Sequence, residues 1–393
     1  MKKKCISIYF ILLTVSTFAQ WTAQVSGTTQ HLKSVYFANA TAGFAVGSIG
    51  AIQKTINGGT NWTTQTSGIT NWLFSSYFTD SNTGYVVGGY GMIIKTIDGG
   101  TTGTPQTSGT SVDLLSVKFV NSSTGYICGN SGKILKTING GTTWTSQTSG
   151  TTNNLFSIFF IDINTGYAVG DMGTILKTIN GGTTWTLQTS GLTTNYLSSV
   201  YFTDVNTGYA VASGGKILKT INGGSNWTQL TSGTTNFLSS VYFPSATTGF
   251  IVGDGGIILK TTNSGANWVS IPSGTTNSLL SVFFIDANIG YVVGNFGTIL
   301  KTTNGGVGIL ENQLPESSVI IFPNPAYDKI QIEITNFKAN SLIIYNLQGQ
   351  KLISRIFQNQ NIIELNISDF AKGIYSVEIQ TENGVVNKKL VVQ

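Results

Sequence analysis

Chemically reactive side chains are scarce in this chain of 393 residues. It has one histidine, His31, and two cysteines, Cys5 and Cys128. Two cysteines make no disulfide framework, and no Cys/His group has the spacing of a zinc site. His31 stands in no motif that would place it in a Ser–His–Asp triad. We therefore expect no metal site, no cofactor and no assigned catalytic residue.

The best pair of acidic residues for acid–base chemistry is Asp113 and Asp171. Both fall in turn-like segments, and the internal repeat of the sequence puts them in neighbouring units, on the same face. A glycoside hydrolase holds two carboxylates about 5–9.5 Å apart across the scissile bond. Aspartate is also common in turns for structural reasons, and that alternative stays open.

Aromatic side chains offer a different chemistry, which is binding. Aromatic rings stack on the faces of sugars and anchor protein partners. We predict a ligand-binding face built from positions that vary between the repeats, namely Trp72, Tyr90, Tyr196, Phe237, Phe296 and His31. The alternative is that these positions are loop tips under no functional constraint.

The charge distribution argues against nucleic-acid binding. Only 9% of the residues are charged, and Lys2–Lys4 supply three of the five formal positive charges. Residues 21–306 contain 11 Lys and 8 Asp but no Arg and no Glu. Without arginine, bidentate recognition of phosphate or guanine is not expected in this region.

A repeat of about 41 residues must position these candidates. Thr-Ile-Asn-Gly-Gly or a close variant begins, in steps of 41 or 42 residues, at Thr55, Thr96, Thr137, Thr178, Thr220, Thr261 and Thr302. Residues 155–191 contain four strand-like stretches, and Asn180-Gly181-Gly182 suits a tight hairpin. Four strands in about 41 residues are typical of a β-propeller blade.

Seven units predict a seven-bladed β-propeller over residues 20–306. The seventh unit lacks the last, Trp-containing strand, whereas such a strand stands alone at 21–25. We expect strand 21–25 to complete the last blade, because closure of the ring buries an open sheet edge. The Gly-Gly turns then lie on one face of the ring and the variable positions on the other.

The segment Thr55-Ile-Asn57-Gly-Gly59-Thr-Asn-Trp62 resembles the Asp-box of BNR-type propellers. Together with the Thr-Gly-Tyr-x-Val-Gly strand, it makes the repeat most similar to propellers of the photosystem II assembly-factor type. The second copy has Gly103 where Trp belongs. The resemblance implies a structural role for the box residues Asn57, Asp98, Asn139, Asn180, Asn222, Asn263 and Asn304.

A lysine precedes every box, at Lys54, Lys95, Lys136, Lys177, Lys219, Lys260 and Lys301. A ring of seven lysines could bind an anionic polymer. The alternative is that each lysine lays its stem along its strand and meets turn carbonyls.

The two ends of the chain indicate export. Residues 1–19 are typical of a signal peptide, with Lys2–Lys4 before an apolar stretch too short to be a stable anchor. Residues 307–318, where Glu first appears, are interpreted as a linker. Residues 319–393 predict a small antiparallel, Ig-like β-sandwich.

Residues 319–393 also resemble the C-terminal type A sorting domain of the type IX secretion system. The matching motifs include Phe322-Pro-Asn-Pro325, Lys372-Gly-Ile-Tyr375 and Lys388-Lys-Leu-Val-Val392. The resemblance implies that this domain is recognised by the type IX secretion machinery. It also implies that the protein reaches the cell surface or the medium.

The sequence thus predicts an all-β protein, a seven-bladed β-propeller followed by a small antiparallel β-sandwich. We expect an exported, non-catalytic, monomeric protein that binds a glycan or a surface protein. We expect neither nucleic-acid binding nor a membrane span after signal removal. Two alternatives remain: an assembly or structural scaffold of the envelope, and a polysaccharide-degrading glycoside hydrolase that uses Asp113 and Asp171.

Overall fold

The computed structural model describes residues 21–306, 319–335, 338–346, 350–381 and 384–393. The expected signal peptide (1–19) and linker (307–318) lie outside the described residues. The chain divides into two compact units, Met1–Gly306 and Val307–Gln393. Among the described residues, no helix has the length and hydropathy needed to traverse a bilayer.

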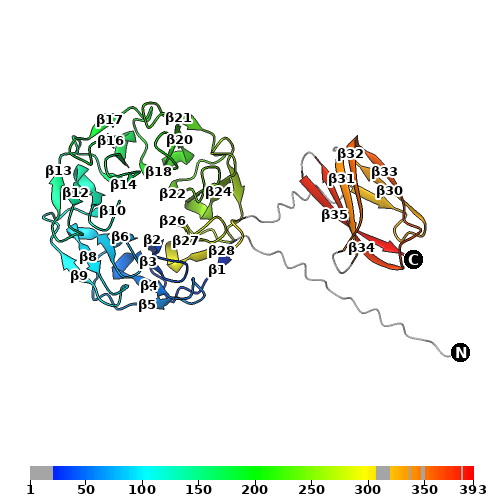
Figure 1. Ribbon diagram of the computed structural model, residues 1–393, viewed down its shortest axis with the longest axis horizontal. Coiled ribbons are helices and arrows are strands. Elements are labelled where there is room, and N and C mark those ends of the chain that lie inside the picture. Colours follow the sequence, from blue (N-terminus) through cyan, green and yellow to red (C-terminus); the bar gives the residue numbers. More distant parts are fainter. Residues whose placement is uncertain (1–20, 307–318, 336–337, 347–349, 382–383) are drawn as a thin grey trace. The chain divides into compact units, whose positions relative to one another are not determined.

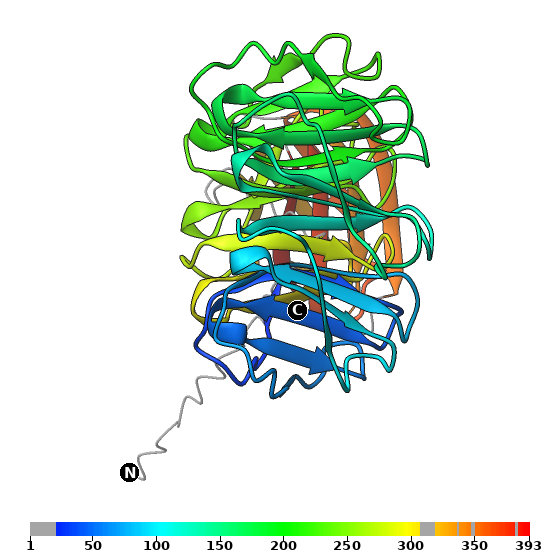
Figure 2. The same cartoon turned by 90° about the vertical axis from the view of Figure 1, so that its left-hand side faces the viewer.

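The first unit is a ring of seven four-stranded antiparallel sheets, as the repeat predicts (Figure 1). In each sheet the first strand lies nearest the centre of the ring and the fourth lies at the rim (Figure 1). Figure 2 shows the ring from its edge, with the turns of the blades gathered on its two faces. The unit is therefore a seven-bladed β-propeller.

The strands follow one another in the order that the repeat predicts. Blades one to three contain β2 (Leu32–Phe37), β3 (Gly43–Gly47), β4 (Ile52–Thr55), β5 (Thr63–Thr64), β6 (Leu73–Phe78), β7 (Gly84–Gly88), β8 (Ile93–Thr96), β9 (Thr104–Gln106), β10 (Leu114–Phe119), β11 (Gly125–Gly129), β12 (Ile134–Thr137) and β13 (Thr145–Gln147). Blades four to six contain β14 (Leu155–Phe160), β15 (Gly166–Gly170), β16 (Ile175–Thr178), β17 (Thr186–Gln188), β18 (Leu197–Phe202), β19 (Gly208–Ala212), β20 (Ile217–Thr220), β21 (Thr228–Leu230), β22 (Leu238–Tyr242), β23 (Gly249–Gly253), β24 (Ile258–Thr261) and β25 (Val269–Ile271). Blade seven contains β26 (Leu279–Phe284), β27 (Gly290–Gly294), β28 (Ile299–Thr302) and β1 (Thr22–Ala23).

Short 3₁₀ turns join the second and third strands of every blade. They are η1 (Ser48–Gly50), η2 (Gly89–Gly91), η3 (Asn130–Gly132), η4 (Asp171–Gly173), η5 (Ser213–Gly215), η6 (Asp254–Gly256) and η7 (Asn295–Gly297).

The start of the described chain closes the ring. Strand β1 pairs antiparallel with β28, with Thr22 opposite Lys301. Trp21 beside it is only 2% exposed and packs edge-to-face on Phe250 and Phe284. The last blade thereby obtains its fourth strand, and its sheet edge is covered.

A phenylalanine–glycine contact is built into every blade between its first two strands. In blade four the ring of Phe160 lies so close to Gly166 that a Cβ atom there would stand 2.5 Å from it. Only glycine fits at this position. The same pair recurs in the other blades as Phe37/Gly43, Phe78/Gly84, Phe119/Gly125, Phe202/Gly208, Phe243/Gly249 and Phe284/Gly290.

The Asp-box is a turn held by its own side chains. In blade four, Asn180 Oδ1 accepts hydrogen bonds from the Thr178 hydroxyl (3.0 Å) and the Thr184 N–H (2.9 Å). The N–H of Gly182 donates to the Thr178 hydroxyl at 2.9 Å. Gly181 and Gly182 have φ of 63° and 82°, which glycine adopts without steric cost. The Thr–Asn or Thr–Asp hydrogen bond recurs at Asn57, Asp98, Asn139, Asn222, Asn263 and Asn304.

Six of the seven boxes are also bound by the blade that precedes them. In blade three, Lys136 Nζ and the Tyr126 hydroxyl both donate to the carbonyl of Gly181 in blade four, at 2.6 and 2.9 Å. We call this pair of donors and its acceptor the inter-blade clamp. Six of the seven lysines before the boxes donate in this way at 2.6–2.7 Å: Lys95, Lys136, Lys177, Lys219, Lys260 and Lys301. Of the two roles considered for the lysines, the structure therefore shows the structural one.

The innermost strands are linked by a ring of serines. In all seven blades, the serine at the third position of the first strand accepts a hydrogen bond from a backbone N–H of the next blade, at 3.2–3.4 Å. The serines are Ser34, Ser75, Ser116, Ser157, Ser199, Ser240 and Ser281.

Six aromatic rings and one lysine form a second circle around the centre, two residues further along each first strand. Lys118 Nζ lies 4.9 Å from the ring centroid of Tyr77 and 5.2 Å from that of Phe159. Burial lowers the pKa of Lys118 to about 8. The circle consists of Tyr36, Tyr77, Lys118, Phe159, Tyr201, Tyr242 and Phe283.

The second unit is the small antiparallel β-sandwich that the sequence predicts. One sheet has the order β29 (Val319–Phe322), β30 (Lys329–Ile334) and β33 (Ile362–Asn366). The other has the order β32 (Lys351–Gln360), β31 (Ala339–Tyr345), β34 (Gly373–Thr381) and β35 (Gly384–Val392). Both sheets contribute to one buried core that includes Ile332, Leu365, Leu342 and Val377.

The clamp predicts a non-additive effect of two substitutions. Y126F and K136M each leave the buried Gly181 carbonyl with one donor, so each costs about 1 kcal/mol of unfolding free energy. The double variant leaves the carbonyl with neither donor and should exceed the sum by about 1–2 kcal/mol. Phe44 and Phe250 occupy the tyrosine position in blades one and six, so phenylalanine fits there. Urea unfolding measures the three variants, and additive losses would contradict the clamp.

A second prediction concerns acid sensitivity. Hydrogen bonds from the hydroxyl and N–H of Thr102 lower the pKa of Asp98 from 3.8 to about 2. A lowered pKa in the fold means that ionised Asp98 stabilises the protein above pH 3.8 and that this stability is lost as the pH falls toward 2. D98N gives this box the asparagine found in the other six. The variant should therefore lose less melting temperature between pH 4 and pH 2 than the parent protein; an equal loss would refute this role.

Candidate functional site

The variable positions predicted to bind a ligand gather on the face of the ring opposite the Asp-boxes. Each blade contributes the residue before its first strand and the middle residue of its 3₁₀ turn. These two positions adjoin within each blade, because the N–H at the start of each 3₁₀ turn donates to the carbonyl of the residue before the first strand of the same blade, as Ser48 donates to His31 at 2.9 Å. Because the sequence predicts that a ligand binds here, we call this surface the ligand face.

Three of the six predicted binding residues form one cluster on the ligand face. The His31 ring lies 6.2 Å from the Trp72 ring in a stacked arrangement and 5.2 Å from the Phe296 ring in an edge-on one. The cluster therefore spans blades seven, one and two. Trp72 and Phe296 are exposed, whereas His31 is half-buried between them.

Two further residues of the first strands extend this cluster and were missed by sequence reasoning. The Phe74 ring lies 6.1 Å from that of Trp72, and Lys33 Nζ lies 5.2 Å from the centroid of the same indole. Burial lowers the pKa of Lys33, and the Asp254 carboxylate partly offsets this. Both residues occupy the second position of their strand. A β-bulge at that position shifts the register with the second strand of the blade, between Leu32 and Ser34 and between Leu73 and Ser75. An isolated sequence carries no clear signal of such a bulge.

The other predicted binding residues lie apart from this cluster. Tyr196 is exposed, and its ring is 6.5 Å from that of Phe156. Tyr90 is 79% exposed and Phe237 is half-buried. Among the described residues, no ring contact joins Tyr90 or Phe237 to another aromatic side chain.

Polar residues before the first strands hold the turns of the neighbouring blade. The N–H of Phe296 donates to Nδ1 of His31 at 3.3 Å. In the same way the N–H of Tyr90 donates to Asp113 and that of Ser131 to Asn154, at 3.0 and 2.9 Å. These residues thus orient the turn tips of the ligand face.

The turn tips are strained at several large side chains. Ile49, Tyr90, Met172 and Phe296 all have φ of 52–58°, in the left-handed region. That conformation costs a residue other than glycine about 1–2 kcal/mol. Blades five and six place Gly214 and Gly255 there and avoid the cost. The four large side chains are at least 58% exposed, so packing within the propeller returns little of this energy.

The two candidate acid–base residues have different surroundings. Asp113 is engaged through both oxygens, with the Tyr90 N–H at 3.0 Å and the Asn130 side-chain amide at 3.4 Å. Asp171 Oδ1 is buried and has no hydrogen-bond partner among the described residues. Within those residues, no group of three His, Cys, Asp or Glu side chains could hold a metal ion.

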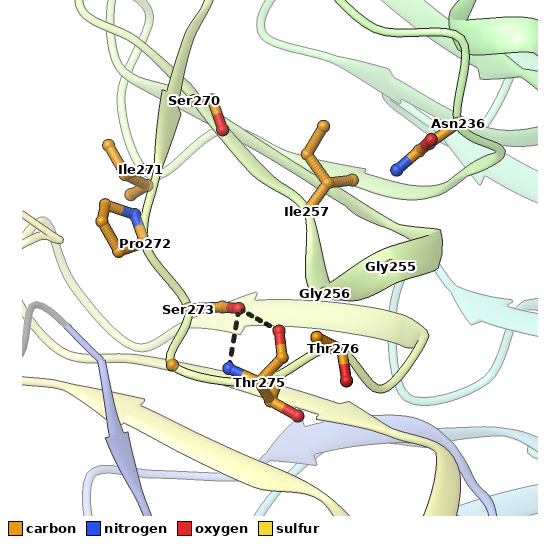
Figure 3. A pocket seen from close by; sticks show the side chains of 11 residues that line it. Asn236, Gly255, Gly256, Ile257, Ser270, Ile271, Pro272, Ser273, Thr275 and Thr276 are labelled. Carbon is orange, nitrogen blue, oxygen red and sulfur yellow. Dashed lines mark hydrogen bonds between the residues drawn. The ribbon is translucent and has the colours of Figure 1, made fainter.

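One hollow on the propeller is a feature of the repeat. It measures about 790 Å³ and lies between the turn at Gly255–Ile257 and the segment Ser270–Thr276 (Figure 3). In it the Ser273 hydroxyl donates to the Thr275 carbonyl and accepts from the Thr275 N–H (Figure 3). Equivalent hollows occur at Ser131–Lys133 in blade three and Gly214–Lys216 in blade five. This recurrence makes it a poor marker of one specific site.

Two family models match the chain. The model for the photosynthesis system II assembly factor YCF48 matches residues 13–104, 61–148 and 184–276, which together are more than half of the chain. The model for the secretion system C-terminal sorting domain matches residues 320–393.

Solved structures share the fold. YCF48 bound to a D1 peptide has a TM-score of 0.64 and 19% identity, over 73% of this chain and 96% of that one. YCF48 from Cyanidioschyzon merolae has a TM-score of 0.63 and 19% identity, over 72% and 98%. A GH74 xyloglucanase from Xanthomonas campestris has a TM-score of 0.61 and 11% identity over 81% of this chain, which spans 59% of the enzyme.

A curated relative matches a shorter segment. An endo-acting ulvan lyase from Formosa agariphila is 30% identical over 84 residues, which are 21% of this chain and 16% of the lyase. The chain thus spans about a sixth of that relative.

The Asp-box geometry, the seven-bladed ring and the matched repeats lead to one conclusion. The chain belongs to the photosynthesis system II assembly factor YCF48 family, and it carries a C-terminal sorting domain of type IX secretion, which directs it to the cell surface or the extracellular space.

Proposed function

We propose that this protein is an exported, non-catalytic binding protein that holds an apolar segment of a polypeptide on its ligand face. The observation that carries the proposal is the set of exposed, strained turn tips at Ile49, Tyr90, Met172 and Phe296. Backbone strain that the fold does not need is commonly kept at binding sites. Exposed isoleucines on the opposite face, such as Ile138, have no such strain.

The chemistry of the tips favours a polypeptide ligand. Isoleucine and methionine side chains cover apolar side chains well, and methionine adapts to irregular surfaces. The tips Ile49, Tyr90 and Phe296 belong to the three blades that form the cluster of His31, Trp72 and Phe296, and aromatic residues of this kind commonly anchor protein partners. Lys33 is the charged group in contact with the cluster, through the Trp72 ring. A structural neighbour in the same family holds a peptide, which supports the same class of ligand for this chain.

A glycan is the second candidate ligand. The Trp72 indole is 41% exposed and backed by His31, as is suitable for stacking on a sugar ring. The similarity to a xyloglucanase and to a segment of an ulvan lyase points in the same direction.

Hydrolysis of a glycan has less support. Both carboxylate oxygens of Asp113 already accept hydrogen bonds, from the Tyr90 N–H and the Asn130 side chain. A general acid or base must instead be within reach of the scissile bond. An assembly or scaffold role remains compatible with the family and would use the same face for a protein partner.

Substitutions on the ligand face test the proposal. The full chain is screened on an array of random 15-residue peptides and on a glycan array. W72A and F296A should weaken binding to the best hit about tenfold or more, because each removes an anchor that contacts His31. I138A, which removes from the Asp-box face an apolar side chain at least as exposed as Trp72 and Phe296, is the matched control and should leave affinity unchanged.

Three results would count against the proposal. Unchanged affinity in W72A and F296A would place the ligand elsewhere. Hits confined to glycans would favour the second candidate. Release of reducing sugars from a bound polysaccharide, abolished by D113N, would establish the hydrolase alternative.

A further inference from the structure

One member of a repeated packing element is absent from blade two. In five blades the last Asp-box residue is a tryptophan: Trp62, Trp144, Trp185, Trp227 and Trp268. In blade seven Trp21 supplies the indole. The equivalent residue of blade two is Gly103, which is exposed.

The indole closes the wedge between neighbouring blades. Trp62 packs edge-on against Phe37 of its own blade and against Tyr291 of the preceding blade, with centroid distances of 5.9 and 6.4 Å. The rings of Phe119, Phe160, Phe202 and Phe243 pack in the same way on the indole of their own blade. Phe78 and Phe44 are the corresponding pair in blades two and one, and they stack on each other at 4.3 Å with no indole beside them.

A cavity of about 510 Å³ lies at this wedge. Phe44, Phe78, Val86, Ile94 and Gly103 are among the residues that line it. Its size is within the usual range for small-molecule sites.

The burial of the wall residues shows where the indole is missing. Ile94 is 9% exposed, whereas its counterparts Leu135, Leu176, Leu218, Leu259 and Leu300 are at most 2% exposed. Val86 is half-buried, whereas its counterparts Ile127, Ala168, Ala210, Ile251 and Val292 are fully buried.

We infer that this wedge is a binding site for a small planar aromatic molecule of about the size of indole. Its walls are those that hold an indole in six other places of the same ring. Apolar cavities with aromatic and aliphatic walls bind such molecules because the ligand restores lost packing contacts. The residues that line it include neither Trp72, His31 and Phe296 nor the strained turn tips, and the site does not depend on the function proposed for the ligand face.

The repeat also predicts what the site recognises. The indole N–H groups of Trp21, Trp62, Trp144, Trp185, Trp227 and Trp268 are buried and have no hydrogen-bond partner within the part of the chain that the structure describes. The wedge should therefore recognise a ligand by the shape and aromatic character of its ring, without a hydrogen bond to a ring N–H. Benzothiophene, which has the outline of indole without the N–H, should bind within about threefold of indole.

Calorimetric titration of the full chain with indole is the test, with two variants as controls. G103W puts the missing indole back and should abolish binding. An added Cβ at Gly103 would stand 2.7 Å from Ile94, so this variant is checked for folding by circular dichroism. W144G opens the equivalent wedge in blade three and should raise the number of bound indole molecules from one to two.

The outcomes separate cleanly. One bound indole in the parent chain, lost in G103W or doubled in W144G, supports the site. No saturable binding to the parent chain overturns it. The same stoichiometry in the parent chain and both folded variants also overturns it, because the indole would then lie elsewhere. Binding of a Trp-containing peptide in place of free indole would show that the wedge takes a side chain of another polypeptide and would overturn the small-molecule assignment.

Discussion

The propeller depends on one recurring contact, the hydrogen bond from a lysine to an Asp-box carbonyl of the next blade, which occurs at six boxes and is joined at five of them by a tyrosine hydroxyl. In blade four this carbonyl belongs to Gly181, and its donors are Lys136 and Tyr126. The box can present that carbonyl only because its own Thr–Asn hydrogen bond fixes the turn. Local turn geometry and the spacing between blades are therefore set together at six of the seven boxes. A blade that lost its box would lose both the hairpin between its last two strands and its hydrogen bonds with the preceding blade.

The hydrogen bonds that hold neighbouring blades together thus lie on the Asp-box face and along the innermost strands. The clamps all lie at the Asp-boxes, and the serine hydrogen bonds join the innermost strands. The opposite face is free to vary without loss of the ring, and there the side chains differ from blade to blade. Gly103 shows that even the inter-blade wedge tolerates one omission, because Phe44 and Phe78 still stack across it.

Much of the fold could be predicted from the sequence, because it is periodic. The 41-residue spacing, the Gly181-Gly182 turn and the Trp-containing strands are local signals, and they lead to seven blades. The lysines were visible as a ring, but only the structure shows that their partners are carbonyls of the next blade. The contact between His31 and Phe296 joins residues 265 positions apart, across the point where the ring closes, so no local pattern could indicate it. Lys33 and Phe74 could not be predicted as members of the cluster, because a β-bulge interrupts the inward–outward alternation of side chains in their strands.

The central claim is that the ligand face, and not the Asp-box face, carries the binding function. Hydrogen–deuterium exchange of the full chain, with and without the best ligand found by array screening, tests it most directly. The account predicts slowed exchange at the turns η7, η2 and η4 and in the segments before β2 and β6. Exchange slowed instead at the Asp-box turns, with no change at Phe296 and Tyr90, would contradict it.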